Sequence, residues 1–331
     1  MIWLTWRQFR TQALVAVAAL AAIAVYLVYL GSGIRDDYAG VVGCLPSDCT
    51  VARHDFSEAY SSQLSIAGLL LIATPALIGL FWGAPLITRE LEEKTDRLVW
   101  NQSVTRTRWL ATKLVFLTLA AVAVTGVFSL LLTWNAGRYD QFVGDRFGAV
   151  NFASRNIVPL GYAAFAFVLG AVVGLVVRRT LLAMALTLAV FAVVQLIVPA
   201  VVRAHLMTPV TSTVAFDEDA MSRSDSFGLG EQGAMIIGYT RAGAWSMTSE
   251  AAVLNADGTP FTIQQGLTCQ KAAPAENMAC MADQNLHFSY TYQPANRYWP
   301  FQWIELAAYL GLTLLLAAIS LWWIRSRIQG S

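Results

Sequence analysis

The chain has few charged residues and lacks the common signatures of an enzyme. Only 13% of its 331 residues are charged, against roughly 25% in soluble domains, whereas 56% are hydrophobic and the mean hydropathy is +0.54. It contains no glycine-rich loop followed by Lys-Ser or Lys-Thr, no Gly-x-Ser-x-Gly elbow and no His-Glu-x-x-His helix. We therefore expect a membrane protein with no catalytic residue, no metal site and no nucleotide bound through such a loop.

Long apolar runs take the place of the missing charge. Crossing about 30 Å of hydrocarbon needs about 20 apolar residues at about 1.5 Å per residue. We expect six runs to be transmembrane helices, the first retained because it is long for a signal-peptide core. Residues 31–62 and 135–156 read as polar loops between runs. The six runs are residues 11–30, 64–87, 109–134, 158–177, 180–202 and 303–324.

Proline and glycine mark two of these runs. Pro75 and Pro85 interrupt the second run and remove backbone donors, so we expect a bend and neighbouring helices that satisfy the freed carbonyls. Gly170 and Gly174 in the fourth run have the small-xxx-small spacing that lets helices approach closely. Packing within one subunit and packing between subunits both fit this spacing.

The polar segment 203–298 is long enough to form a small mixed α/β domain. An Asp-Gly turn signal at residues 257–258 and the alternating aromatic residues of the HFSYTY segment at 287–292 indicate β-strands. The Ser-, Gly- and Asp-rich residues 217–233 are typical of loops.

The first ten residues form an amphipathic segment. Apolar residues recur there at helical spacing with basic residues between them, which predicts a short helix lying in the membrane interface. The alternative is that the segment is the first turn of the following span, with snorkelling arginines. The residues that would contact the interface are Trp3, Trp6, Arg7, Phe9 and Arg10.

Charge is distributed unequally across the six spans. The side that holds both termini carries 12 basic and four acidic residues, whereas the other side carries 10 basic and 16 acidic residues. Because positive loops face the cytoplasm, we expect a multi-pass membrane protein with cytoplasmic N- and C-termini. The expected parts are an interfacial helix at 1–10, transmembrane helices at 11–202, an extracellular domain at 203–298, and a last transmembrane helix with a cytoplasmic tail at 299–331.

All four cysteines fall on the expected outer side, where an oxidising compartment favours two disulfides. We favour pairing Cys44 with Cys49 and Cys269 with Cys280, because these pairs close the shortest loops and cost the least entropy. Cross-pairing stays open. A Cys/His metal site is a further alternative, although the spacings match no usual zinc pattern.

Two strongly polar residues, Gln195 and Glu305, lie well inside the spans. Ionisable residues inside a membrane are functional hypotheses by default, which makes these two candidates for a polar pathway between the helices. The alternative for Glu305 is a solvated carboxylate, because it lies only two residues past Trp303, near the outer interface.

The connection between the second and third runs is the most charged short connection in the chain. Residues 81–113 leave one apolar run and enter the next, with six basic and four acidic residues between them. We expect a short cytoplasmic helix at about 89–105 whose charges contact a partner; for each charge, a solvated face is the alternative. The candidate contact residues are Arg89, Glu90, Glu92, Glu93, Thr95, Arg97, Arg106 and Arg108.

This connection resembles the inner loop of type-2 ABC exporter permeases, most closely those of actinobacteria. Their pattern is Arg-Glu-x-Glu-x-Gly-Thr, then Ser/Pro-Val-Thr/Ser-Arg-x-Arg and a lysine at the head of the next span; Lys94 stands here in place of the glycine. The resemblance extends to the N-terminal WLTWRQFR and to YQPANRYWPFQWIE before the last span. The matching residues are Arg89, Glu90, Glu92, Thr95, Ser103, Val104, Thr105, Arg106, Arg108 and Lys113.

Together with the spans, the resemblance implies a fold, a location in the bacterial plasma membrane and a set of partners. The fold is an all-α polytopic membrane protein: six transmembrane helices, an N-terminal interfacial helix, a cytoplasmic coupling helix between helices 2 and 3, and a small mixed α/β extracellular domain between helices 5 and 6. The partners are two cytoplasmic ABC ATPase subunits, which bind the ATP and magnesium, and a second permease copy or paralogue. The chain itself would bind membrane lipid and a hydrophobic or amphipathic substrate, such as a drug, antibiotic, peptide or lipid, but no cofactor and no nucleic acid.

Besides that of a permease subunit of an ABC exporter, two other functions stay open. The first is an ABC-linked permease that transmits a signal, with a ligand bound by its extracellular domain; unchanged substrate flux despite ATPase stimulation would favour it. The second is a membrane enzyme acting on a lipid-linked substrate, which the lack of an acid/base or nucleophile constellation disfavours. Activity retained by the isolated outer domain would favour that second function.

Overall fold

The computed structural model divides the chain into two compact units, which are described separately. The first unit comprises residues 1–143, 149–206 and 299–331, and the second comprises 144–148 and 207–298. The residues that the structure describes are 2–43, 50–92, 105–143, 145–230, 233–269, 277, 280–281 and 283–326.

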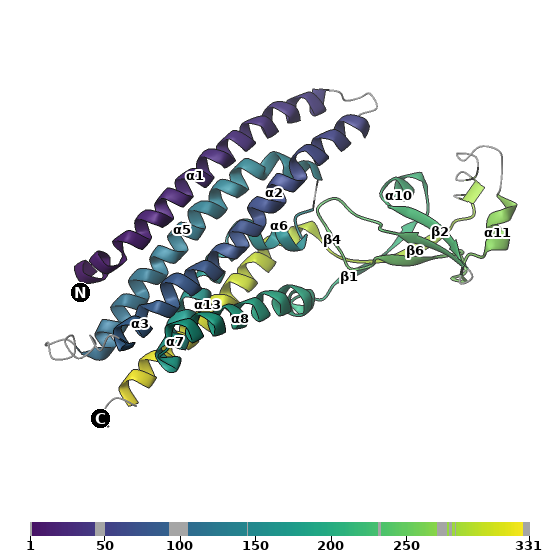
Figure 1. The fold of residues 1–331 in the computed structure, drawn as a ribbon. Helices are drawn as coiled ribbons and strands as arrows, with labels where there is room; N and C mark the ends of the chain where they lie inside the picture. Colours follow the sequence, from purple (N-terminus) through teal and green to yellow (C-terminus); the bar gives the residue numbers. More distant parts are fainter. Residues whose placement is uncertain are drawn as a thin grey trace. The chain divides into compact units, whose positions relative to one another are not determined.

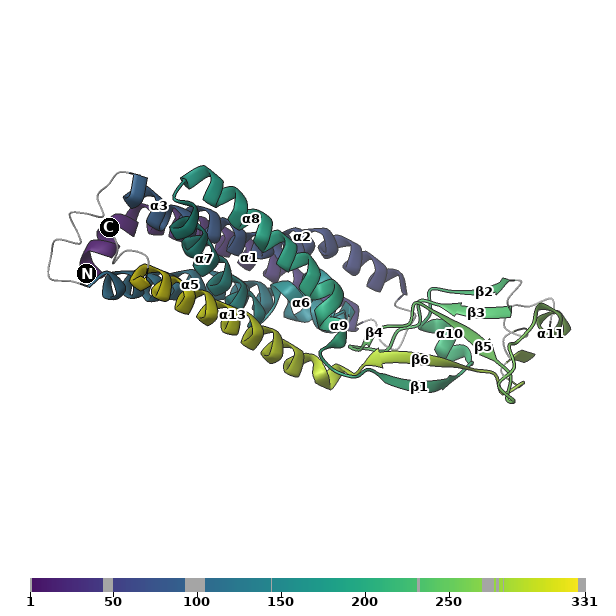
Figure 2. The same cartoon turned by 90° about the horizontal axis from the view of Figure 1, so that it is seen from below.

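The first unit is helical (Figure 1). Its described residues contain six helical regions long and apolar enough to cross a membrane, as the sequence predicts. Both views place the beginning of α1 and the end of α13 at the end of the unit where α3 lies, which we call the α3 end (Figures 1 and 2). The elements are α1 (Ile2–Gly43), α2 (Thr50–Ile78), the π-helix η1 (Gly79–Gly83), α3 (Ala84–Glu92), α5 (Arg106–Val143), α6 (Ala149–Ser154), α7 (Val158–Val177), α8 (Thr180–Ile197), the π-helix η2 (Val198–Val202), α9 (Arg203–His205) and α13 (Tyr298–Ser326).

Helix α7 forms the centre of this unit. It has the bounds of the fourth predicted run, and every residue from Gly161 to Ala171 is buried. It contacts α2, η1, α3, α5 and α8. Because α7 is apolar all round, with no polar stripe for solvent, it is suited to a position surrounded by other helices.

Residues 31–62 and 135–156 are largely helical, so the prediction of polar loops there is wrong. Helices α1 and α5 continue beyond their predicted ends, and α2 begins before its predicted start. Their extensions share a buried apolar cluster that includes Ile34, Phe56 and Tyr139. These residues are separated by polar ones, so mean hydropathy is low where the chain is still an amphipathic helix.

The second unit is built on an antiparallel sheet with the strand order β1-β6-β5-β3-β2, in which β4 also pairs with β6. Its buried cluster includes Phe216, Ile236, Val253, Phe261 and Phe288. The elements are β1 (Val210–Ala215), α10 (Glu218–Ser222), β2 (Ser226–Gly230), β3 (Gly233–Ile237), β4 (Trp245–Ser246), β5 (Glu250–Leu254), α11 (Ile263–Thr268), β6 (His287–Gln293) and the 3-10 helix η3 (Ala295–Arg297).

The strand predictions for this unit are confirmed. In β6, Phe288 and Tyr290 are buried whereas Ser289 between them is exposed. The predicted Asp-Gly turn follows β5, and Gly258 adopts a φ of +83°, which a residue with a side chain rarely adopts.

The loop prediction for residues 217–233 is wrong, because this segment contains α10 and β2. The Asp217 carboxylate accepts a hydrogen bond from the Ala220 N–H at 2.8 Å and thereby caps α10. In the sequence, the sign that a helix starts here is Asp217. Aspartate is also common in loops, so the sign is ambiguous.

Pro85 frees a backbone carbonyl in the second span, and a neighbouring helix satisfies it, as the sequence predicts. Proline has no N–H to donate to the carbonyl four residues earlier, which is that of Phe81. The Gln12 amide of α1 donates to that oxygen instead, at 3.4 Å. The helix widens here into the π-turn η1, in which the Ala84 N–H donates to Gly79 five residues earlier.

Glycines let the second span and α7 meet backbone to backbone. A β-carbon on Gly83 would lie 2.5 Å from the carbonyl oxygen of Phe167, and one on Gly174 would lie 2.6 Å from that of Ala84. Gly170 packs in the same way against Gly79. The small-xxx-small spacing of α7 therefore serves packing within the subunit, against η1 and α3.

Replacing Gly174 by alanine should destabilise the helical unit. The added methyl group has no space against the backbone of α3, and such overpacking costs about 1–3 kcal/mol. The matched control is Gly311→Ala in α13, where a β-carbon would meet nothing within 4 Å. The measurement is the free energy of unfolding of the purified protein in mixed micelles. Equal stability of the two variants would contradict the close contact.

Candidate functional site

The predicted coupling segment begins as a helix. Helix α3 follows η1 without a break and is described as far as Glu92. The structure describes the chain again from Thr105, so most of the predicted 89–105 helix lies outside the described residues. Arg89 and Arg108, on either side, are exposed. Of the other predicted contact residues, Glu93, Thr95 and Arg97 lie outside the described residues, as do the side chains of Glu90 and Arg106.

The Glu92 carboxylate binds the beginning of α8. Its Oε1 accepts a hydrogen bond from the Thr180 backbone N–H at 2.9 Å, and its Oε2 lies 2.8 Å from the Thr180 hydroxyl. The Thr180 hydroxyl also lies 2.8 Å from that of Thr88 on α3. The Thr180 backbone N–H and hydroxyl hold the pKa of the Glu92 carboxyl below its usual range, so the group is charged at neutral pH.

A negative charge at this position is favourable for two reasons. The first N–H groups of a helix have no partner within the helix, and the helix dipole places partial positive charge there. The residue before α8, Arg179, provides no side-chain cap, so a carboxylate from another helix takes that role. The sequence identifies Glu92 as a candidate contact residue but gives no sign that Thr180 is its partner.

The N-terminal segment is continuous with the first span. Within the described residues, α1 runs through residues 2–10 into the span without a break, which fits the alternative of a first turn. Phe9 is buried and packs edge-on against Trp82 of η1, with ring centroids 4.7 Å apart. Trp3, Trp6, Arg7 and Arg10 are exposed, and their contact with lipid headgroups stays a prediction.

Glu305 lies in a buried polar cluster at the end of α8 opposite the α3 end. It is 1% exposed, so the alternative of a solvated carboxylate is wrong. Arg203 Nε donates to its Oε2 at 2.8 Å and Arg203 Nη2 donates to its Oε1 at 3.0 Å. The Tyr162 hydroxyl of α7 donates to Oε1 at 2.5 Å. The guanidinium carbon of Arg203 lies 4.0 Å from the centroid of the Phe152 ring.

Gln195 takes part in a neighbouring contact. Its Oε1 accepts a hydrogen bond from the Tyr309 hydroxyl at 2.7 Å, and the Tyr309 ring packs edge-on against Tyr162 at 4.7 Å. Both polar residues found in the sequence are therefore held by partners in the surrounding helices. Their role in a pathway stays a prediction.

Arg203 lies in a different unit from the one predicted for it. The prediction assigned it to the extracellular domain, whereas the structure places it in the helical unit, directly after η2, and 2% exposed. The apolar run before it continues past Pro199 through a π-turn, in which the Arg203 N–H donates to the Val198 carbonyl five residues earlier. A buried carboxylate such as Glu305 needs a cation nearby. That requirement could have pointed to a buried basic residue such as Arg203 as its partner.

An apolar cavity of about 450 Å³ lies among α1, α2, η1 and α5. Small residues, including Ala16, Ala19 and Ala73, make room for it. The side chains of Thr11, Gln12 and Thr74 add three polar groups to a lining that is otherwise aliphatic and aromatic. Its volume lies in the range of about 300–1,000 Å³ that is usual for small-molecule sites.

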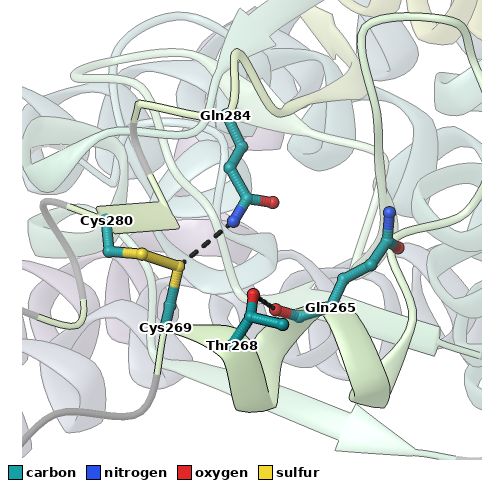
Figure 3. The surroundings of a disulfide bond; sticks show 5 residues. All are labelled: Gln265, Thr268, Cys269, Cys280 and Gln284. Carbon is teal, nitrogen blue, oxygen red and sulfur yellow. Dashed lines mark hydrogen bonds between the residues drawn. A yellow bond between two sulfur atoms is a disulfide. The ribbon is translucent and has the colours of Figure 1, made fainter.

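The second unit contains the predicted disulfide between Cys269 and Cys280 (Figure 3). The Gln284 amide donates to Cys269 Sγ at 3.1 Å, and the Thr268 hydroxyl donates to the Gln265 carbonyl at 2.5 Å. The expected partners Cys44 and Cys49 lie outside the described residues. Across the described part of the chain, no group of three or more His, Cys, Asp and Glu residues is arranged to hold a metal ion.

Replacing Arg203 by methionine should strongly destabilise the helical unit. The change leaves the Glu305 carboxylate buried without its cation, which costs about 3–5 kcal/mol, whereas Arg203→Met with Glu305→Met should recover much of that loss. Double-mutant analysis of the unfolding free energy measures the coupling.

The control for this experiment is Arg223→Met, which breaks the exposed ion pair with Asp219 in the second unit and should cost less than about 1 kcal/mol. Additive losses for the two substitutions at Arg203 and Glu305 would contradict an energetic link between them.

Comparison with known proteins identifies the family. A sequence model of the ABC-2 membrane transporter related family matches residues 17–203, more than half of the chain. The match runs from within α1 to Arg203 of α9, and it includes η1, α3, α7 and α8. Searches of curated proteins and of solved structures gave no match. In agreement with the resemblance of its charged connection, the chain belongs to the ABC-2 membrane transporter related family and is an ABC-2 type permease.

Proposed function

We propose that the protein is the membrane-spanning subunit of an ATP-driven ABC exporter that moves an amphipathic compound outward. The observation that carries the proposal is the continuity of the charged helix α3 with the second span. A short charged helix that is continuous with a span transmits a displacement applied to it from outside the membrane. ATP binding and hydrolysis belong to separate ATPase subunits, because this sequence has no phosphate-binding loop.

The α3 end faces the cytoplasm in this proposal. The excess of basic residues lies on the side of the two termini and of the charged connection. The beginning of α1 and the end of α13 both lie at the α3 end (Figures 1 and 2). The second unit then lies on the outer side, where an oxidising compartment suits the Cys269–Cys280 disulfide.

Closure of two ATPase subunits around ATP displaces α3. Because Gly83 and Gly174 bring the second span and α7 into backbone contact, a push on α3 reaches the central helix directly. A second permease copy or a paralogue completes the pathway, which alternates between inward and outward opening. Mixed charges on the coupling segment dock in a polar cleft of the ATPase and fix the orientation of the two proteins.

The substrate class follows from the lining of the helices. The cavity among α1, α2, η1 and α5 takes an apolar group, and Gln12 and Thr74 offer hydrogen bonds to a polar one. Drugs, antibiotics, peptides and lipids that combine both kinds of group fit this lining.

Purification from the native membrane should recover an ABC ATPase together with this chain, and vesicles that contain both should accumulate substrate only with ATP.

Glu90→Arg with Glu93→Arg should lower the amount of substrate moved per ATP by more than about tenfold, because reversed charges repel the cleft that binds them. The control is Glu58→Arg, an exposed glutamate of α2 on the predicted outer side.

Transport without a nucleotide-hydrolysing partner would refute the proposal. ATPase stimulation by a compound that is never moved would instead identify a signal-transmitting permease. Wild-type transport by the variant with Glu90 and Glu93 reversed would show that the coupling segment is not the site of coupling.

A further inference from the structure

Helix α8 is held by polar contacts at both of its ends. At one end, both carboxylate oxygens of Glu92 are engaged with Thr180. At the other end, α8 continues through η2 into Arg203, whose guanidinium makes two hydrogen bonds to Glu305 of α13. Thr180 and Arg203 are about 35 Å apart along the helix axis, which is close to the thickness of a membrane core.

Between these ends α8 has little side-chain packing. Of its residues, Ala183, Thr187 and Phe191 are buried, whereas Leu181, Leu196 and most of the other large apolar side chains are exposed. Apolar side chains that face lipid contribute little to fixing one helix against another, because lipid tails solvate them equally well. Helix α8 packs against α7, η1 and α3 through these few buried side chains, and its Gln195 accepts a hydrogen bond from Tyr309 of α13. The polar contacts at its two ends add directional links to α3 and to α13.

The Glu92 carboxylate contacts its own subunit, unlike a charge whose atoms are free to bind a partner protein. Both of its oxygens point at the beginning of α8, so its charge is directed at the helix dipole of its own subunit. Thr88, one turn before it on α3, adds a second contact to the same Thr180 hydroxyl. Two side chains of α3 thus converge on one residue of α8.

We propose that Glu92 is a positioning residue that ties α8 to α3, so that a displacement of α3 is carried along α8 to the Arg203–Glu305 pair. This inference rests on the proposed function. It assigns to Glu92 a role inside the subunit, and it makes α8 the helix through which the coupling segment acts on the opposite side of the membrane. Loss of a helix cap of this kind is expected to change an equilibrium by a factor of about five.

The test is a double-mutant cycle in vesicles that contain the full chain with its ATPase. Glu92→Ala should lower the substrate moved per ATP by about fivefold. Thr180→Val, which keeps the backbone N–H that binds Oε1, should lower it less, and the double variant should be no worse than Glu92→Ala. Thr180→Ser retains the hydroxyl and should behave as wild type. Glu92→Gln retains one acceptor oxygen without the charge and should fall between wild type and Glu92→Ala.

A second readout separates transmission from mere stability. Spin labels are attached through non-natural amino acids at His205, exposed at the end of α9, and at Tyr29, exposed on α1, so that the cysteines stay intact. ATP should change the distance between the labels in the wild type. Glu92→Ala should abolish that change while the ATPase still binds and the unfolding midpoint stays within a few degrees.

The outcomes distinguish the two proposals. If Glu92→Ala shows normal coupling and a normal distance change in a working ATPase complex, the role of Glu92 is overturned and the proposed transport function still stands. Additive losses in the double variant would show that Glu92 acts elsewhere than on Thr180. Absence of any ATPase partner would refute the proposed function itself.

Discussion

A polar group among apolar helices has to find its partner inside the protein, because the surrounding hydrocarbon offers none. In the helical unit, the Phe81 carbonyl freed by Pro85 accepts from Gln12, and the Glu305 carboxylate binds Arg203 and Tyr162. At the exposed α3 end, Glu92 binds the open N-terminus of α8. Each contact joins helices that are distant in the sequence, so satisfying polar groups also fixes the arrangement of the spans.

Backbone contact supplies the other constraint on this unit. Where η1 and α3 meet α7, glycines replace side chains and the two backbones touch, which leaves no space for gradual adjustment. Helix α8 differs, since only a few of its side chains are buried. The unit therefore combines a rigid centre around α7 with a more weakly packed helix beside it, an arrangement suited to passing a displacement from one side of a membrane to the other.

Much of the fold was predictable from local sequence. The apolar runs predicted six spans, and the alternation of Phe288 and Tyr290 predicted a strand with one buried face. The helical extensions around Ile34 and Phe56 were missed because polar residues between the buried positions lower the mean hydropathy. The helix α10 was missed because Asp217, which caps it, occurs as readily in loops.

The partners within the candidate site were much less predictable. Glu92, Gln195 and Glu305 were recognisable from residue type and position alone, and the family was recognisable from the pattern around Arg89. Their partners were not, because Thr180 lies 88 residues after Glu92 and Arg203 lies 102 residues before Glu305. No local pattern encodes such pairings.

The sequence by itself determined that the chain enters the membrane repeatedly, since hydropathy and length are properties of a segment and need no neighbour. It also determined which side is basic and which glycines could allow close approach. Only the tertiary structure decided which helix those glycines meet, that the Glu305 carboxylate is buried, and that Glu92 caps a helix of its own subunit. These are facts about pairs of groups, and the burial that makes them energetically important exists only after the helices have packed.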